Sequence, residues 1–161
     1  MELPVLAKLK KELADLKYEF TFKLPKELAA AAAHGDLSEN AEYEAAKHRQ
    51  DFVRSRIAQL ESRIRELAMY NIASIPRGVV AYGSRVTVAD VDTGDEELYR
   101  IVLPEEVDAG RGHISLSSPI GRALMNKVEG DEVEVQTPSG KRSYQIVTLI
   151  TLHDQDGAES A

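Results

Sequence analysis

Residues 34–43 read HGDLSENAEY, and we expect the chain to turn there. Glycine adopts the left-handed backbone conformation in which many helices end, so Gly35 marks the end of one helix. Helical apolar repeats lie on both sides of this stretch, from Leu6 to Phe20 before it and from Tyr43 to Leu67 after it. We therefore expect two helices that meet here, at the tip of an antiparallel hairpin.

The apolar residues of both helices follow alternating steps of three and four, the spacing of a coiled-coil seam. At about 1.5 Å per residue, helices of roughly 28 residues would form an arm about 40 Å long. Pro25 lacks a backbone donor, which predicts a kink in the first helix at residues 22–24. The seam residues are Leu6, Leu9, Leu13, Leu16 and Phe20 in the first helix and Tyr43, Ala46, Gln50, Val53, Ile57, Leu60, Ile64 and Leu67 in the second.

After Leu67 the pattern changes from helical repeats to short alternating runs. Residues 73–78 include the sequence PRG, which is typical of a linker. Beyond the linker, alternating and β-branched residues predict a mostly antiparallel β domain with turns at Thr93-Gly94 and Ser139-Gly140. The predicted strands are residues 79–82, 85–91, 97–103, 113–116, 132–137 and 143–152.

One helix is predicted within this β domain. The predicted helix covers residues 120–127. Ser118 is a favoured N-cap for it, and Pro119 is favoured at the first helical position that leads into it. The residues from His153 onward are polar, and we expect them to be frayed. The predicted fold is therefore α+β, with a coiled-coil arm (1–72), a linker (73–78), an antiparallel β domain with one helix (79–153) and a polar tail (154–161).

Composition excludes several classes of protein. The chain of 161 residues has no cysteine, which excludes disulfides, thiolate metal sites and a cysteine nucleophile. Apolar runs are too short to span a membrane and no signal peptide is recognisable, so we expect a cytoplasmic protein without a membrane partner. Residues 1–72 carry 12 Lys and Arg against 12 Asp and Glu, whereas residues 73–161 carry 8 against 15. The acidic second half disfavours binding to naked nucleic acid and suits either a protein partner or a solvated surface.

Asp36 and Glu39 at the predicted tip admit two interpretations. Their spacing fits a capping box, in which Asp36 is the N-cap of the second helix and Glu39 reaches back to its amide. It also fits a weak site for Mg²⁺, which accepts one or two carboxylates together with substrate phosphate. The place at the end of an arm, beside Glu42, Glu44 and an exposed Leu37, favours the second interpretation. Two carboxylates alone hold Mg²⁺ weakly, so the ion would be shared with a partner.

Residues 34–47, HGDLSENAEYEAAK, closely resemble the tip of the Gre transcript-cleavage factors, specifically of the GreA type. The resemblance continues through residues 99–102, YRIV, and residues 114–124, ISLSSPIGRAL, and so covers nearly the whole chain. It implies a coiled coil that enters the secondary channel of backtracked bacterial RNA polymerase, and an FKBP-like β domain that docks at the channel rim. The factor would be a monomer and an accessory, not an enzyme alone: the polymerase would cleave the 3′ end of its nascent RNA and resume elongation.

The resemblance also implies roles for individual residues. Asp36 and Glu39 match the two acids that help to hold the catalytic Mg²⁺ jointly with the polymerase active site. The family's tip-supporting residues correspond in this chain to Ser38, Asn40 and Tyr43. Polymerase-binding positions are matched by Ser117, Ser118 and Pro119. The family also contacts the extruded RNA through a basic patch on the arm, for which the candidates here are Lys47, Arg49, Arg54 and Arg56.

Departures from the family leave alternatives open. The proline lies about three residues later in the first helix than the family usually places it, and alanines stand just before His34 where the family carries charged residues. The chain could therefore be a paralogue that plugs the secondary channel and inhibits without cleavage. It could also be a coiled-coil adaptor unrelated to transcription, with a capping box at its tip. The scattered arginines are equally compatible with a solvated face.

Overall fold

The computed structural model describes residues 3–35 and 40–159, with side chains described as far as Gln155. The predicted tip residues Asp36, Ser38 and Glu39 lie outside these described residues. The chain divides into two compact units, residues 1–73 and residues 74–161. The boundary between them falls within the predicted linker.

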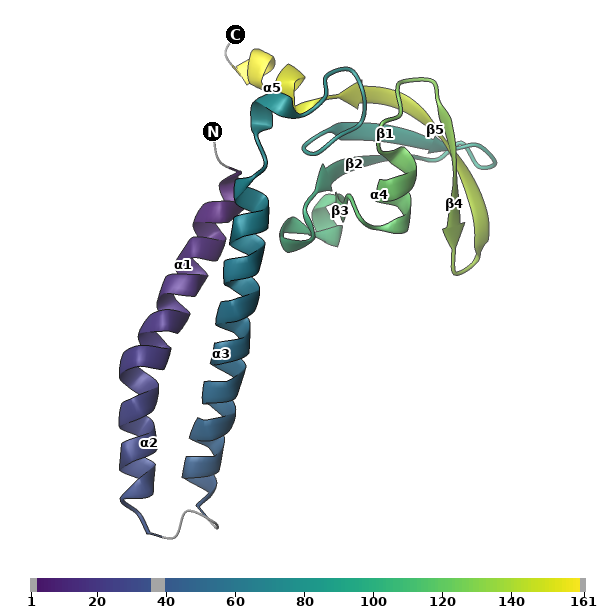
Figure 1. The fold of residues 1–161 in the computed structure, drawn as a ribbon. Coiled ribbons are helices and arrows are strands. Elements are labelled where there is room, and N and C mark those ends of the chain that lie inside the picture. Colours follow the sequence, from purple (N-terminus) through teal and green to yellow (C-terminus); the bar gives the residue numbers. More distant parts are fainter. Residues whose placement is uncertain (1–2, 36–39, 160–161) are drawn as a thin grey trace. The chain divides into compact units, whose positions relative to one another are not determined.

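The first unit is a helical hairpin (Figure 1). Its first half consists of α1 (Pro4–Tyr18), a π-helical segment (Glu19–Lys23) and α2 (Leu24–Ala32). Its second half is the single helix α3 (Ala41–Ala68), whose 28 residues correspond to about 42 Å of helix. A short 3₁₀ segment, Ile72–Ser74, follows. The predicted hairpin is confirmed.

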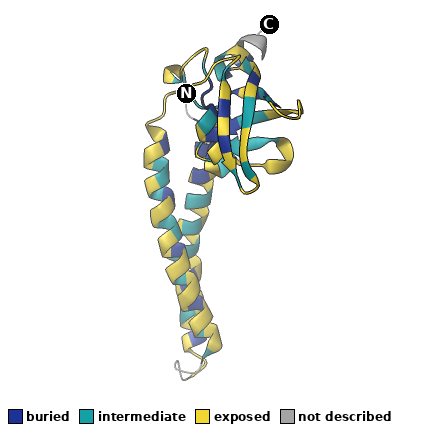
Figure 2. Ribbon diagram, turned by 90° about the vertical axis from the view of Figure 1, so that its right-hand side faces the viewer, coloured by how far each residue is buried: buried dark blue, intermediate teal, exposed yellow. Residues whose placement is uncertain are grey.

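Apolar side chains fill the seam between the two halves of the hairpin. Leu24 and Val53 are completely shielded from solvent, and Leu60 and Leu67 are nearly so. The predicted seam residues are all buried or half-buried, and Leu24 was not among them. Figure 2 shows buried and half-buried positions recurring among exposed ones along both halves of the arm. The three-four spacing therefore predicted the seam correctly.

The first half of the hairpin is irregular just before Pro25. In a regular α-helix Pro25 would donate a hydrogen bond to the carbonyl of Thr21, but proline has no N–H. The chain forms a π-helical turn at Glu19–Lys23 and then restarts, with Pro25 in the first turn of α2, where proline is tolerated. The interruption was predicted, but it begins three residues earlier than the expected 22–24 segment.

The second unit contains a five-stranded mixed sheet in the order β3-β2-β1-β5-β4. Every neighbouring pair is antiparallel except β2 and β3, which run parallel. The parallel pair arises because residues 103–112 cross over through two 3₁₀ turns instead of forming a hairpin. The α+β class is confirmed, but the antiparallel prediction is wrong at this edge. The strands are β1 (Arg85–Asp90), β2 (Glu96–Val102), β3 (His113–Ser115), β4 (Glu132–Thr137) and β5 (Gly140–Ile150).

The strand predicted at residues 79–82 is wrong. Val80 donates to the carbonyl of Lys127 and accepts from the amide of Asn126, both at 2.8 Å, but this exchange does not extend into a ladder. The chain turns immediately afterwards at Gly83, whose φ is +81°. A continuing strand is incompatible with this turn, which an alternating apolar pattern does not reveal.

The core of the second unit lies between the sheet and α4 (Pro119–Leu124), around which the sheet curls in Figure 1. Val86, Ile101 and Leu124 are completely buried there. The Ser118 side chain accepts a hydrogen bond from the Gly121 amide at 3.1 Å, which confirms the predicted N-cap. The helix is shorter than the predicted segment 120–127 and ends at Leu124.

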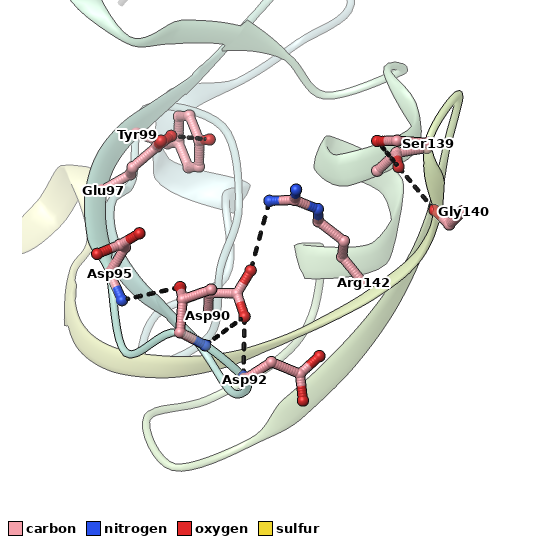
Figure 3. A network of polar contacts seen from close by, with 10 residues as sticks. Asp90, Asp92, Asp95, Glu97, Tyr99, Ser139, Gly140 and Arg142 are labelled. Carbon is pink, nitrogen blue, oxygen red and sulfur yellow. Dashed lines mark hydrogen bonds and ion pairs between the residues drawn. The ribbon is translucent and has the colours of Figure 1, made fainter.

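The turn between β1 and β2 is organised by Asp90 (Figure 3). Its Oδ1 accepts hydrogen bonds from the amides of Asp92, at 2.8 Å, and Thr93, at 3.1 Å. Its Oδ2 lies 3.5 Å from Nη1 of Arg142 on β5. Gly94 then takes a φ of +78°, as the predicted Thr93-Gly94 turn requires. The nearly buried carboxylate is thus fully used in holding the turn.

The predicted frayed tail is instead a second helix, α5 (Leu152–Glu159). Thr151 donates to Oδ2 of Asp154 through its amide, at 2.9 Å, and its hydroxyl, at 2.8 Å. These hydrogen bonds lower the pKa of the Asp154 carboxyl. The buried Gln155 side chain donates to the Gly83 carbonyl at 2.8 Å, and His153 Nε2 lies 2.9 Å from the Ile75 carbonyl. Both the single-helix and the frayed-tail predictions are therefore wrong.

Candidate functional site

The end of the hairpin is defined by the residues on either side of the acidic motif. The predicted acids Asp36 and Glu39, and Ser38 between them, are outside the described residues. The structure places the end of α2 and the start of α3 next to each other at the far end of the arm (Figure 1). The whole connection runs from Ala33 to Asn40.

Asn40 joins the two helix ends through its side-chain amide. Its Nδ2 donates to the carbonyl of Ala31 in α2 at 2.6 Å, and its Oδ1 accepts from the backbone amide of Tyr43 in α3 at 3.1 Å. The first bond uses a carbonyl near the C-terminus of α2, and the second satisfies an amide at the N-terminus of α3. We call this pair of hydrogen bonds the Asn40 clasp. It fixes where the acidic connection leaves one helix and enters the next.

The Asn40 clasp bears on the capping-box interpretation of the acids. α3 begins at Ala41, and its N-cap is Asn40. The interpretation in which Asp36 caps the second helix and Glu39 completes a capping box is therefore wrong for α3. The adaptor hypothesis therefore loses the α3 capping box on which it depended.

Five exposed or half-buried side chains lie near the start of α3. Tyr43 is half-buried and contributes its amide to the Asn40 clasp. His34 Nε2 lies 3.9 Å from a carboxylate oxygen of Glu42, and His48 Nε2 lies 3.7 Å from a carboxylate oxygen of Glu44. Glu42 and Glu44 therefore each have an imidazole within ion-pair distance. A protonated imidazole attracts a neighbouring carboxylate.

The four basic candidates on the arm differ in their partners. Arg49 is bidentate to Glu19, with Nε–Oε2 and Nη2–Oε1 distances of 2.6 and 2.8 Å. Arg56 is bidentate to Glu12 at 2.9 and 3.2 Å. Their hydrogen bonds link α3 to the first half of the hairpin.

The remaining two basic candidates are exposed. Arg54 lies 3.2 Å from Asp51 and 5.5 Å from the centre of the Phe20 ring. Lys47 is exposed and has no ion pair with another described residue. The three arginines are therefore engaged within the arm, and Lys47 is the one of these four candidates that has no ion pair with a described residue.

The predicted polymerase-binding residues form the turn between β3 and α4. Ser118 is engaged, because its Oγ donates to the Ser115 carbonyl at 2.7 Å and accepts from Gly121. Ser117 and Pro119 are exposed. Gly121 permits the turn: a Cβ at this position would lie 2.1 Å from the Ser115 carbonyl oxygen. Ser117 hydrogen-bonds to Ser115 Oγ through its amide, at 3.1 Å, and its hydroxyl, at 2.7 Å. Ser117 and Pro119 remain exposed to a partner, while Ser118 and Gly121 shape the turn.

Two structural features escaped the sequence analysis. The Glu12–Arg56 and Glu19–Arg49 pairs were missed, although both partners recur at a spacing of seven, the heptad signal for ion pairs between helices. The role of Gly121 was missed because its contact is with Ser115 on another element, which local spacing does not reveal.

Two features are absent from the described part of the chain. No helix within residues 3–35 and 40–159 is long and apolar enough to cross a membrane. The same residues contain no group of three or more acidic or histidine side chains that could hold a metal ion.

Family comparison covers nearly all of both units. Residues 5–68 match the model of the N-terminal domain of transcription elongation factors, and residues 75–151 match that of the GreA/GreB C-terminal domain. The chain belongs to the GreA/GreB family of transcription elongation factors. The acidic motif, the Asn40 clasp and the arm are therefore parts of the N-terminal GreA/GreB domain, and the Ser117–Pro119 turn is part of the C-terminal one.

Individual GreA/GreB relatives match over similar lengths. Transcription elongation factor GreA of Hyphomonas neptunium is 44% identical over 140 residues, which cover 85% of this chain and 89% of the relative. GreA of Anaeromyxobacter sp. is 42% identical over 155 residues, covering 96% and 93%. The crystal structure of GreA factor homolog 1 (Gfh1) of Thermus thermophilus is 26% identical, with a TM-score of 0.41, and the match covers 89% of this chain and 93% of that one.

Proposed function

We propose that this family member binds backtracked bacterial RNA polymerase through its secondary channel and stimulates cleavage of the nascent RNA at its 3′ end. Cleavage creates a new 3′ end from which elongation resumes. The hydrolysis belongs to the polymerase, and the factor acts as an accessory in the bacterial cytoplasm. Its family membership and the agreement between its tip sequence and that of the family support this assignment.

The Asn40 clasp is the observation that carries the proposal. It ties the end of α2 to the start of α3, the two helix ends that flank the acidic motif in the sequence, and it caps α3 through the Asn40 side chain. The roughly 42 Å of α3 give the arm enough length to reach from a protein surface into a deep channel. A motif held at the end of a long, stapled hairpin suits delivery into the active site of another protein.

The chemistry of Asp36 and Glu39 fits Mg²⁺. Their carboxylates are hard oxygen donors, and Mg²⁺ commonly binds through one or two such groups with substrate phosphate and water completing its shell. Two ligands are too few for firm binding by this chain alone, so the polymerase active site would supply the others. Mg²⁺ held there stabilises negative charge that develops at the reacting phosphate. The role of this chain is to bring the two acids to that position and orient them.

The turn at Ser117 and Pro119 is the candidate docking surface of the second unit. Both residues are exposed, and the Ser118 cap and the close approach of Gly121 to Ser115 fix the backbone that presents them. We assign to this turn the contact with the rim of the polymerase channel.

A transcript-cleavage assay tests the proposal. Stalled, backtracked elongation complexes with end-labelled RNA are incubated with the factor or with the Asp36→Ala/Glu39→Ala variant. We expect the variant to lose at least about a hundredfold in cleavage rate while retaining polymerase binding. Glu44→Gln removes an exposed carboxylate close to the motif and should stay within about threefold of wild type.

Two outcomes would reject this function. Cleavage that persists in the double variant would remove the role of the carboxylates. Binding of both proteins without RNA shortening by either would identify a channel-plugging inhibitor instead.

A further inference from the structure

We propose that the outer face of the sheet in the second unit binds a second copy of this chain. The outer face is the side of the sheet turned away from α4, and three rows of side chains on β2, β1 and β5 form its centre. The inference goes beyond the proposed function and does not depend on it. The acidic row is Glu96, Ala89 and Gln145, the middle row is Leu98, Thr87 and Thr148, and the basic row is Arg100, Arg85 and Ile150.

The register of β1 places the three rows on one face. Side chains alternate between the two faces of a strand. Val86 and Val88 of β1 are buried in the core of the second unit, so Arg85, Thr87 and Ala89 lie on the opposite, outer face. Their cross-strand partners in β2 and β5 share that face.

The basic row is unfavourable within a single copy. Arg85 and Arg100 are directly opposite each other on β1 and β2. The Arg100 amide donates away from β1, to the Gly112 carbonyl at 2.9 Å, so the arginines form a non-hydrogen-bonded pair, the kind with closer side chains. Like charges in such positions destabilise a sheet. Neither arginine forms an ion pair with another described residue, so an external carboxylate would relieve the repulsion.

The rest of the face supplies apolar side chains and a carboxylate. Leu98 and Ile150 are 61% and 45% exposed. Val147, the extra residue of the β5 bulge, is 40% exposed next to the middle row. Glu96, in the acidic row, is exposed and has no ion pair within the described part of the chain. The face therefore has an apolar centre between unpaired charges of opposite sign.

This arrangement is complementary to itself under a two-fold rotation. The axis would lie between two stacked faces, perpendicular to the strands and through the middle rows, so that the strand direction of the second copy is reversed. Arg100 of each copy then lies over Glu96 of the other, and Leu98 lies over Leu98 at the centre. Homodimers commonly use such isologous contacts. Charge complementarity therefore selects a second copy as the occupant.

The size and shape of the face predict a weak dimer. Three strands about 4.8 Å apart and three rows about 6.8 Å apart give a contact of roughly 14 by 20 Å. The sheet curls around α4, so its outer face is convex and only the centre can meet a second copy (Figure 1). Stable complexes bury about 800 Å² on each partner, which is more than twice this area. The net charge of −7 on each copy also opposes association. We expect a dissociation constant between about 30 μM and 1 mM.

Sedimentation equilibrium of the full chain, from about 5 μM to 2 mM, tests the inference. Arg100→Glu and Glu96→Arg should each weaken self-association at least about tenfold, because each places like charges opposite one another twice in the dimer. An equimolar mixture of the two variants restores both ion pairs and should associate within about threefold of wild type. Arg122→Glu makes the same charge change at an exposed position of α4, on the other side of the sheet, and should behave as wild type.

Three outcomes would overturn the inference. The first is a wild-type chain that stays monomeric at the highest concentration, and the second is a dimer that persists in both single variants. The third is a mixture that stays as dissociated as each variant alone, which would show that Arg100 and Glu96 do not face each other. Thermal unfolding of each variant confirms that it is folded. Because the experiment measures mass and not RNA cleavage, it can fail without affecting the proposed function.

Discussion

Asn40 shows how one side chain can fix the geometry of a functional tip. Its amide is both donor and acceptor, so it bonds a carbonyl of α2 and an amide of α3 at the same time. Aspartate could cap α3 but could not donate to Ala31, and serine is too short to span both helices. An asparagine is therefore the residue that this geometry requires.

We predict that removing the Asn40 clasp destabilises the arm in two steps. Asn40→Ser should retain the cap of α3 but lose the bond to Ala31, at a cost of about 1 kcal/mol. Asn40→Ala should lose both bonds, at a cost of about 2 kcal/mol. Thermal unfolding followed by circular dichroism at the helical band measures both. An Asn40→Ala variant as stable as wild type would show that the clasp does not hold the tip.

Single-residue features were predictable where their cause is local. The Ser118 cap follows from a serine, a proline and an amide three residues later, all within one short segment. The Asn40 clasp was expected only as tip support through the family resemblance, because its second partner lies nine residues away on another helix. Gly121 depends on Ser115 in the same way and carried no local signal.

At the scale of elements, ion pairs hold the two halves of the hairpin together around its irregular segment. Glu19 is the first residue of the π-helical turn, and its partner Arg49 lies on the regular helix α3. The Arg49 hydrogen bonds lower the pKa of the Glu19 carboxyl. A lowered folded-state pKa contributes stability that is present above the unfolded value, about pH 4.3, and is lost as the pH falls through the folded value.

We therefore predict that Glu19→Gln makes the folding stability of the arm depend less on pH in the acidic range. At pH 7 the variant should be less stable by about 0.5 to 1 kcal/mol, since the pair is partly exposed and screened. Between about pH 5 and pH 3 its stability should fall less steeply than that of wild type. Helical unfolding at several pH values tests this. Asp15→Asn breaks only the exposed pair with Lys11 and is the matched control; equal curves for Glu19→Gln and Asp15→Asn would contradict the prediction.

Secondary structure was predictable where periodicity and burial agree, and not where tertiary contacts decide. Regular repeats predicted α3 and the strands β1, β2 and β4 to within about two residues. α5 was missed because its segment is polar, and its docking depends on Gln155 meeting the carbonyl of Gly83, distant in sequence. The parallel pairing of β3 was missed because strand direction depends on the crossover that precedes it.

The docking of α5 leads to a further prediction. Gln155→Glu at neutral pH replaces the donor to Gly83 with a buried carboxylate, so the second unit should lose at least about 2 kcal/mol of stability. Gln136→Glu makes the same chemical change at an exposed position of β4 and should have little effect. Denaturant unfolding compares the two variants. Similar stabilities would mean that α5 does not dock as described.

At the scale of the whole molecule, the two units divide the work. The arm has no net charge over residues 1–72 and carries the acidic motif at its end, whereas the excess of acidic residues lies in residues 73–161. An acidic second unit is suited to docking on a protein and not on nucleic acid. Under the proposed function, the second unit docks on the polymerase and the arm delivers two carboxylates. The boundary between the two units was predictable from sequence because composition and periodicity both change near residue 73.

The measurement that tests the central claim most directly is the Mg²⁺ dependence of RNA cleavage in a stalled, backtracked complex. The rate is measured against Mg²⁺ concentration without factor, with wild type and with Asp36→Asn/Glu39→Gln. We predict that wild type lowers the half-saturating Mg²⁺ concentration about tenfold or more, equivalent to about 1.4 kcal/mol of added binding. The variant should bind polymerase but leave that concentration at its factor-free value. Faster cleavage by wild type without a change in Mg²⁺ requirement, or an equal shift by the variant, would contradict carboxylate delivery.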